Sequence, residues 1–228
     1  MHTKLKWNAI GFESKTILLL ESLIKIRNEI PKDHSKKIEK VQRFIDELSH
    51  IIDTVDLIKQ DLIPRLEKSF RINFKTPELI MLALSRPSIR HTYENIEIYF
   101  RKNSRDPLKP EEYKELASSG DAGNVLALIG DSVLGLAIVQ LLWDSSLSTV
   151  GDLSKKRESI VSNENLAKLA DKYNLYSIRL KRLNDPSEKK TKEKTIIHEK
   201  GTLVESIFGV IYLEFGFDDL LRIIPFIQ

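Results

Sequence analysis

The stretch Val125 to Trp143, VLALIGDSVLGLAIVQLLW, decides the fold of this chain because it is apolar throughout except for Asp131 and a few small or polar residues. Its length is close to that of a membrane span. A central aspartate is costly in a span, 30% of the chain is charged, and no other stretch resembles a span or a signal peptide. We therefore predict no membrane insertion and a helix buried on nearly all sides of a globular core. A carboxylate in such a helix needs a cation, hydrogen-bond donors or water as its partner.

The overall composition favours an all-α fold. Glycine and proline are scarce, with 9 and 8 of 228 residues, whereas Leu, Ile, Lys and Glu are abundant. The chain has no cysteine, which excludes disulfides and thiolate metal sites and fits a cytoplasmic protein. The net charge is only +3, so a nucleic-acid site would have to be a local basic patch.

The first part of the chain, residues 1–70, predicts an N-terminal helical arm. Apolar residues recur at helical spacing from Phe12 to Ile30 and again from His34 to Phe70. Pro31 ends the first helix, and Pro64 should kink or divide the second. We predict an antiparallel helical hairpin that serves in packing or dimerisation.

A second domain is predicted over residues 71–228, and it opens with a polar region. Thr76 and Pro77 are residues that begin a helix. The following residues, as far as Asn124, are expected to form a loop that contains a short helix from Pro110 to Ala117. Basic residues in this region form either a solvated face or a partner site: Arg86, Arg90, His91, Arg101, Lys102 and Arg105.

Two short helices and a basic segment follow the apolar stretch. Ser154 is the expected cap of one helix and Asn163 the expected cap of the next. The stretch from Tyr176 to Lys200 is rich in lysine and arginine around a proline. It is either a loop that follows a phosphate backbone or a loop that only keeps the chain soluble.

The last apolar helix repeats the pattern of the first, with Glu205 near its start. Gly209 follows one turn later on the same face, where another backbone can approach closely. If the two helices cross at these points, Asp131 and Glu205 meet. Two neighbouring carboxylates repel each other unless a cation lies between them. Ligation by oxygen alone suits Mg²⁺ or Mn²⁺. In the alternative interpretation the acids lie apart, each near a helix N-terminus.

The chain resembles the ribonuclease III family in three matches, the second made of two stretches, which follow the family's order between Phe74 and Phe217. PELIMLALSRPSI resembles the opening helix, ELLxxALTHxSY. LALIGDSVLGL is similar to the signature LEFLGDAVLEL, and GDLSKKRESIVSNENLAKLA to the stretch EGxLSxLRxxLVxxxxLA after it. TLVESIFGVIYLEFGFD resembles the closing helix, DxxEALIGAIYLDGGxE. Residues 94–123 form a long insertion without a family counterpart.

The resemblance implies an all-α, ribonuclease III-like endonuclease domain after the helical hairpin. It implies a homodimeric, cytoplasmic, metal-dependent endoribonuclease that cleaves double-stranded RNA to 5′-phosphate products in RNA processing. Family members of the smaller Mini-III branch lack a double-stranded-RNA-binding domain, and the sequence reaches Gln228 without one. The roles of the arm and of the insertion stay open.

The active-site pattern departs from that of the larger family members, which have four carboxylates. Asp131 and Glu205 match two of them, whereas Ala127 and Thr202 occupy the other two positions and Val150 replaces a further glutamate. The Mini-III branch has both of the first two substitutions, so the pattern is closest to that branch. The lost acids also favour an alternative function, that of a catalytically inactive ribonuclease III-like duplex-RNA-binding or scaffold protein.

The resemblance assigns roles to individual residues. Asp131 and Glu205 would be catalytic and would bind Mg²⁺, with Mn²⁺ as a substitute. Asn124 and Thr202 would orient water around the metal. The residues expected to contact RNA are Arg179, Lys181, Arg182, Lys189, Lys190, Lys192, Lys194, Arg86, Arg90 and Lys156.

Overall fold

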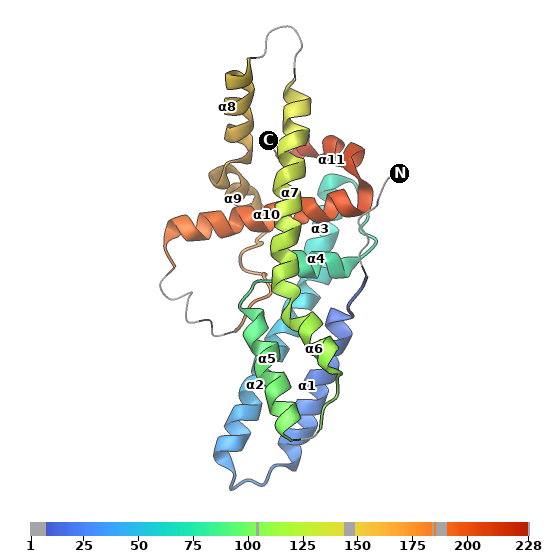
Figure 1. Cartoon of the computed structure of the whole chain (residues 1–228), viewed down its shortest axis with the longest axis vertical. Helices are drawn as coiled ribbons and strands as arrows, with labels where there is room; N and C mark the ends of the chain where they lie inside the picture. The colour runs from blue at the N-terminus through green and yellow to red at the C-terminus, as the bar shows by residue number, and fades with distance from the viewer. Residues whose placement is uncertain (1–7, 104, 144–148, 184, 186–190, 228) are drawn as a thin grey trace.

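The computed structural model describes residues 8–103, 105–143, 149–183, 185 and 191–227. Within these residues the fold is all-α, as predicted, and the only β pairing is an isolated bridge between Ser85 and Leu180. A long helix, α7 (Ser119–Leu142), runs through the molecule, and α10 (Glu193–Phe215) crosses it (Figure 1).

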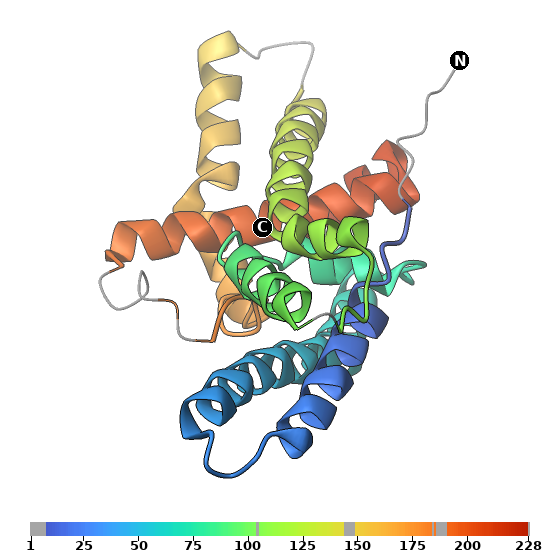
Figure 2. The ribbon, with the colours of Figure 1, turned by 60° about the horizontal axis from the view of Figure 1, so that its bottom comes forward.

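The N-terminal hairpin is confirmed. Helices α1 (Phe12–Glu29) and α2 (Ser35–Leu57) pack side by side and extend from one end of the molecule (Figure 2). A π-helical turn, η1 (Ile58–Leu62), separates α2 from α3 (Ile63–Phe70). The division falls directly before Pro64, because proline lacks the N–H and crowds the preceding turn.

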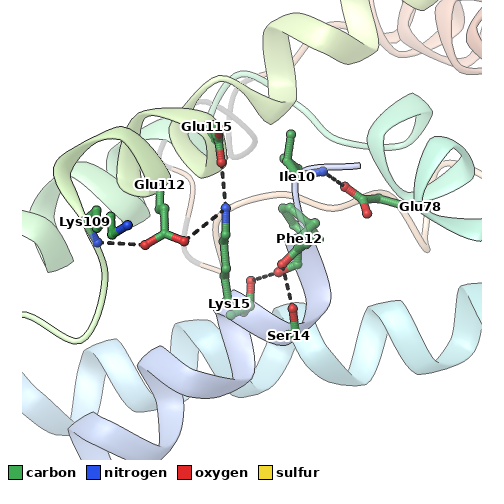
Figure 3. Close-up of polar contacts among 10 residues, drawn as sticks. Ile10, Phe12, Ser14, Lys15, Glu78, Lys109, Glu112 and Glu115 are labelled. Carbon is green, nitrogen blue, oxygen red and sulfur yellow. Dashed lines mark hydrogen bonds and ion pairs between the residues drawn. The ribbon is translucent and has the colours of Figure 1, made fainter. Parts of the chain in front are cut away.

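The start of the arm is tied to the rest of the chain by polar contacts (Figure 3). The backbone N–H of Ile10 donates to Glu78 Oε1 at 2.8 Å. Lys15 Nζ lies 2.6 Å from Glu115 Oε2 and 3.5 Å from Glu112 Oε1. One hydrophobic cluster includes side chains of both the arm and the remaining helices. The division of the chain into two domains after residue 70 stays a prediction.

The region after the arm starts with a helix at the predicted place, α4 (Pro77–Ala83). The Thr76 side chain makes no capping hydrogen bond. The carboxylate of Glu214 instead accepts from the backbone N–H groups of Lys75 and Thr76, at 2.8 Å each.

The prediction of a long loop before α7 is wrong for the first half of that region. That part forms α5 (Ile89–Lys102), whereas the short helix α6 (Pro110–Ala117) is where it was expected. Three buried residues of α5, Tyr93, Ile96 and Phe100, are spaced by three and four along the chain. This helical period was present in the sequence but was masked by the many charged residues between them.

Helix α7 begins before the predicted start and is not buried on all sides. Val125, Leu128 and Leu136 are 56%, 67% and 59% exposed. Among the described residues α7 is the only helix that is long and apolar enough to span a membrane, and a third of its most apolar window is buried. Core helices of water-soluble proteins pass the same test, and the opposite face of α7 packs on α10.

Glycines allow α7 and α10 to cross with their backbones in contact. A Cβ atom on Gly130 would lie 1.7 Å from the carbonyl oxygen of Glu205, and one on Gly209 would lie 2.1 Å from that of Leu126. Any side chain at either position would therefore push the helices apart. The close approach predicted at Gly209 is confirmed.

The helices after α7 begin slightly earlier than predicted. Helix α8 (Val150–Val161) is capped by Thr149, whose Oγ1 accepts a backbone hydrogen bond at 3.2 Å, and not by Ser154. Helix α9 (Asn163–Lys172) is capped by the Ser162 hydroxyl. The chain ends with α11 (Phe217–Ile223) and η3 (Ile224–Ile227).

The predicted basic loop is too long at its C-terminal end, because α10 already starts at Glu193. No proline or turn sequence interrupts the chain between Glu193 and Gly201, and Lys, Glu and Ile all continue a helix at little cost. Residues from Glu193 onward are therefore held on a rigid element.

Candidate active site at the crossing of α7 and α10

The crossing brings Asp131 and Glu205 together. Asp131 follows Gly130 on α7 and is exposed, whereas Glu205 is half-buried on α10 with its own carbonyl oxygen against Gly130. Burial, and after it the negative charge of Asp131, together raise the pKa of the Glu205 carboxyl to about 7. This effect of Asp131 on Glu205 favours the interpretation in which the two acids meet.

The paired carboxylates fit a divalent cation bound through oxygen. A cation between them would offset both the mutual repulsion and the loss of solvation at Glu205. The described residues contain no group of three or more His, Cys, Asp or Glu side chains arranged for a metal. The protein would supply two carboxylates, and water would complete the coordination, as Mg²⁺ commonly allows.

The positions of the missing family acids have different surroundings. Ala127 is buried at 5% exposure, on the side of α7 that packs into the core. Val150 is 84% exposed at the first turn of α8. The Thr202 hydroxyl, one turn before Glu205, donates to the carbonyl oxygen of His198 at 3.1 Å.

A cleft of about 760 Å³ reaches Thr202, one turn before Glu205, but neither acid lines it. Both residues predicted to orient water, Asn124 and Thr202, are on its wall. The amide oxygen of Asn124 accepts a hydrogen bond from Arg86 Nη2 at 3.1 Å. Asp131 instead lines a second cavity, of about 480 Å³, between α7 and α8.

The cleft gathers part of the predicted RNA-binding set. Arg86, Arg179, Lys181 and Lys192 all line it, although they come from three separate parts of the chain. Arg86 and Arg179 are buried at 6% and 4% exposure. Arg179 Nε pairs with Glu199 Oε1 at 3.1 Å, and its guanidinium lies 3.6 Å from the ring centre of Tyr176.

The other predicted RNA contacts lie elsewhere. Arg182 Nε pairs with Glu47 Oε1 of the arm at 3.2 Å, and Arg90 pairs with Asp121. Each of these side chains is therefore already held by a carboxylate. Lys156 on α8 and Lys194 on α10 are exposed, and Lys189 and Lys190 lie outside the described residues.

Three residues near the two cavities were not singled out from the sequence. His198 and Glu199 line the cleft, whereas the basic composition around them indicates a loop and does not mark the start of α10. Arg157 of α8 lines the second cavity with Asp131. Its guanidinium lies so close to Gly135 that a Cβ there would be 3.1 Å from Nε. In the sequence, only Gly135, one turn after Asp131, indicates that another side chain could pack this closely on α7.

Comparison with known proteins places this crossing inside a recognised domain. Residues 124–216 match the family model described as the ribonuclease III domain. Ribonuclease 3 of Campylobacter jejuni is 26% identical over 157 residues, which are 68% of this chain and 56% of the relative. Ribonuclease 3 of Rhizobium meliloti is 34% identical over 112 residues, 47% of this chain and 45% of the relative. The chain thus spans about half the length of these relatives.

Among solved structures, the nuclease domain of ribonuclease III from C. jejuni is similar to this chain. It was described for flexibility in a region involved in dimer formation. It has 26% identity and a TM-score of 0.48, and the match covers 71% of this chain and 92% of that domain. The family-model match, residues 124–216, includes both Asp131 and Glu205. Residues 124–216 of this chain thus match the ribonuclease III domain, and the relatives found along this part of the chain are ribonucleases 3.

Proposed function

We propose that the chain is a metal-dependent endoribonuclease that cleaves double-stranded RNA and leaves 5′-phosphate ends. The observation that carries the proposal is the meeting of Asp131 and Glu205 at the glycine crossing, within a ribonuclease III domain. The relatives are named ribonuclease 3, which supports the same activity. The protein would act in RNA processing in the cytoplasm, as a Mini-III-like member of the family.

The two carboxylates would hold Mg²⁺, or Mn²⁺ in its place. When bound, the ion would supply charge stabilisation at a phosphate and activate a water molecule. Asp131 is exposed and would contribute a ligand oxygen from the solvent side, whereas half-buried Glu205 would approach from the core side. With a pKa of about 7, the Glu205 carboxyl loses its proton near neutral pH, when it would become able to bind the metal.

Recognition of RNA would use backbone phosphates and duplex shape. The major groove of A-form RNA is too narrow for side chains to read bases. Lys181 and Lys192 line the cleft and Lys194 is exposed on α10, so phosphates of the duplex would contact these cations. Asn124 and Thr202 on the cleft wall would orient water beside the acids.

We further propose that a second copy of the chain covers the exposed strip of α7. Val125, Leu128 and Leu136 stand out from the helix, and Val150 at the start of α8 is 84% exposed. Exposed apolar side chains that recur along one helix are typical of an interaction site. A homodimer would bury the strip and carry one Asp131–Glu205 site on each chain.

A second candidate function is a catalytically inactive duplex-RNA-binding or scaffold protein. The observation that favours it is the replacement of family acids by Ala127, Val150 and Thr202, which leaves no group of three ligand side chains among the described residues. Both functions require binding of duplex RNA, so they differ only in whether the RNA is cleaved.

The test is cleavage of a long RNA duplex in Mg²⁺, in Mn²⁺ and in EDTA, followed by analysis of the ends. The proposal expects cutting in either metal, none in EDTA, and 5′ ends that accept label from a kinase only after phosphatase treatment. Binding of the duplex without cutting in either metal would support the scaffold. Cutting that persists in EDTA would contradict the metal-dependent mechanism.

A further inference from the structure

Arg86 is a buried cation without an anionic partner among the described residues. Its side chain is 6% exposed. Nε donates to the carbonyl oxygen of Ser85 at 3.2 Å and Nη2 donates to Asn124 Oδ1 at 3.1 Å, and both acceptors are neutral. A buried charge is costly unless an opposite charge compensates it. The cleft onto which Arg86 opens is therefore a place where an anion would be stabilised.

The carboxylate whose charge acts on Arg86 is already paired with a second arginine. Glu199 pairs with Arg179, whose Nε lies 3.1 Å from Glu199 Oε1. Burial lowers the pKa of the Arg86 guanidinium, Glu199 raises it, and Arg179 lowers it again. Glu199 thus acts on the charge of Arg86 while its contact is with Arg179.

The cleft as a whole has a net positive charge, and its wall carries hydrogen-bond donors that suit a phosphate. Its described lining includes four cationic side chains against two carboxylates, a net charge of +2 with His198 neutral: Arg86, Arg179, Lys181 and Lys192 against Asp185 and Glu199. The hydroxyl groups of Ser88 and Thr195 are also on the wall. Guanidinium, ammonium and hydroxyl donors around one space are the groups that bind phosphate.

We infer that this cleft binds a phosphoryl group, with the Arg86 guanidinium as its buried contact and Lys192 at its rim. Thr202, on the cleft wall, is one turn before Glu205, about 5 Å along the axis of α10. If the source is RNA, which rests on the proposed nuclease function, the cleft holds a phosphate next to the one at the carboxylates. The other possible source of the phosphoryl group is a small molecule that carries a phosphate.

The first experiment uses the full chain in EDTA, so that no metal or cleavage is involved. Sodium phosphate is titrated against sodium chloride at equal ionic strength, and the Arg86 Nε–H signal is followed by NMR. We expect a saturable shift of that signal, a loss of at least about tenfold in phosphate affinity for Arg86→Gln, and a loss of about threefold for exposed Lys192→Gln. The control Lys168→Gln, exposed on α9 outside the cleft, should bind as the wild type does.

The Lys192→Gln variant keeps the test decisive if Arg86→Gln fails to fold. An Arg86 signal that does not respond to phosphate, or a Lys192→Gln variant that binds like Lys168→Gln, would overturn the inference. Neither outcome depends on whether the chain cuts RNA. A protein that binds phosphate at Arg86 but never cleaves RNA would support this site and remove only the nuclease function.

A second experiment distinguishes the two sources. Binding of a short RNA duplex in EDTA is measured by fluorescence anisotropy. If RNA supplies the phosphoryl group, free phosphate competes with the duplex more strongly than chloride does, and Lys192→Gln weakens RNA binding about threefold. If RNA binding is unchanged while phosphate still shifts the Arg86 signal, the inferred site is supported and its ligand is a free phosphate-bearing molecule.

Discussion

Gly130 of α7 lies against the carbonyl oxygen of Glu205 of α10, at a distance that leaves no room for a Cβ atom. The residue after this glycine is Asp131, so the contact that joins the helices also sets the two acids beside each other. Packing and chemistry therefore depend on the same few atoms. A change at the crossing should affect stability and the candidate site together.

We predict that Gly130→Ala lowers the free energy of unfolding by about 3 kcal/mol, because the new methyl group would overlap backbone that cannot move aside. Gly151→Ala on α8 is the matched control. The nearest atom to its Cβ is Thr149 Oγ1 at 3.9 Å, and alanine in a helix should stabilise by about 0.5 kcal/mol. Urea unfolding measures both. Equal effects of the two substitutions would refute the tight crossing.

The Glu205 carboxyl should titrate near pH 7 in the metal-free protein, because burial and Asp131 both favour its neutral form. Asp131→Asn should lower this pKa without restoring the ordinary value, since burial remains. Saturating Mg²⁺ should lower the pKa in the wild type. Carbon-detected NMR of the Glu205 carboxyl measures its pKa in the metal-free wild type, in Asp131→Asn and in saturating Mg²⁺. A pKa near 4.5 that does not change in Asp131→Asn would contradict the pairing of the two acids.

The same shift predicts how stability depends on pH. The folded state holds the Glu205 proton up to about pH 7, whereas the unfolded chain releases it near pH 4.5. Between these values the folded state binds more protons, so this group makes the free energy of unfolding fall as pH rises. Glu205→Gln should remove that part of the slope, and an unchanged slope in the variant would count against the raised pKa.

Glu47 should stabilise the joint between the arm and the chain segment that leads to the cleft. Its carboxylate is buried, accepts from the Thr92 hydroxyl and pairs with Arg182. Glu47→Ala should cost about 2 kcal/mol, because Arg182 and Thr92 lose their acceptor in a site closed to most water. Exposed Glu39→Ala on the same helix should cost almost nothing in thermal or urea unfolding. If Glu47→Ala and Glu39→Ala were equally stable, the Glu47–Arg182 pair would not contribute to stability.

The strip on α7 should control oligomeric state. Leu136→Glu places a charge where the second copy would pack, so sedimentation should show a shift from dimer to monomer with the fold retained. Ile98→Glu on α5 is the control, since Ile98 is 49% exposed but lies outside the strip. A wild-type chain that is monomeric at micromolar concentration would exclude the proposed dimer surface.

Local sequence patterns predicted much of this fold. The arm, the break at Pro64, and the close approach at Gly209 followed from spacing and residue type, because each depends on a few neighbouring residues. Helix α5 was missed because its buried residues are separated by many charged ones. The exposure of Leu128 was missed because composition shows that a helix is apolar but not which face is covered.

The candidate site was predictable only in part. Asp131 and Glu205 stood out because each is a lone acid in an apolar helix. The partners of the basic residues were not predictable. Nothing near Arg182 in the sequence indicates that Glu47 holds it, and nothing near Arg86 indicates that it would be buried. Both facts depend on contacts between residues far apart in the chain.

The measurement that tests the central claim most directly is cleavage of an RNA duplex in Mg²⁺ by the wild type, Asp131→Asn and Glu205→Gln, with duplex binding measured in parallel. The account predicts cutting by the wild type, loss of at least about a thousandfold in rate for either variant, and retained RNA binding and folding in both. Near-normal cutting by either variant would contradict the assignment of the two carboxylates. Binding without cutting by the wild type itself, in Mg²⁺ and in Mn²⁺, would show that the chain is a duplex-binding protein and not a nuclease.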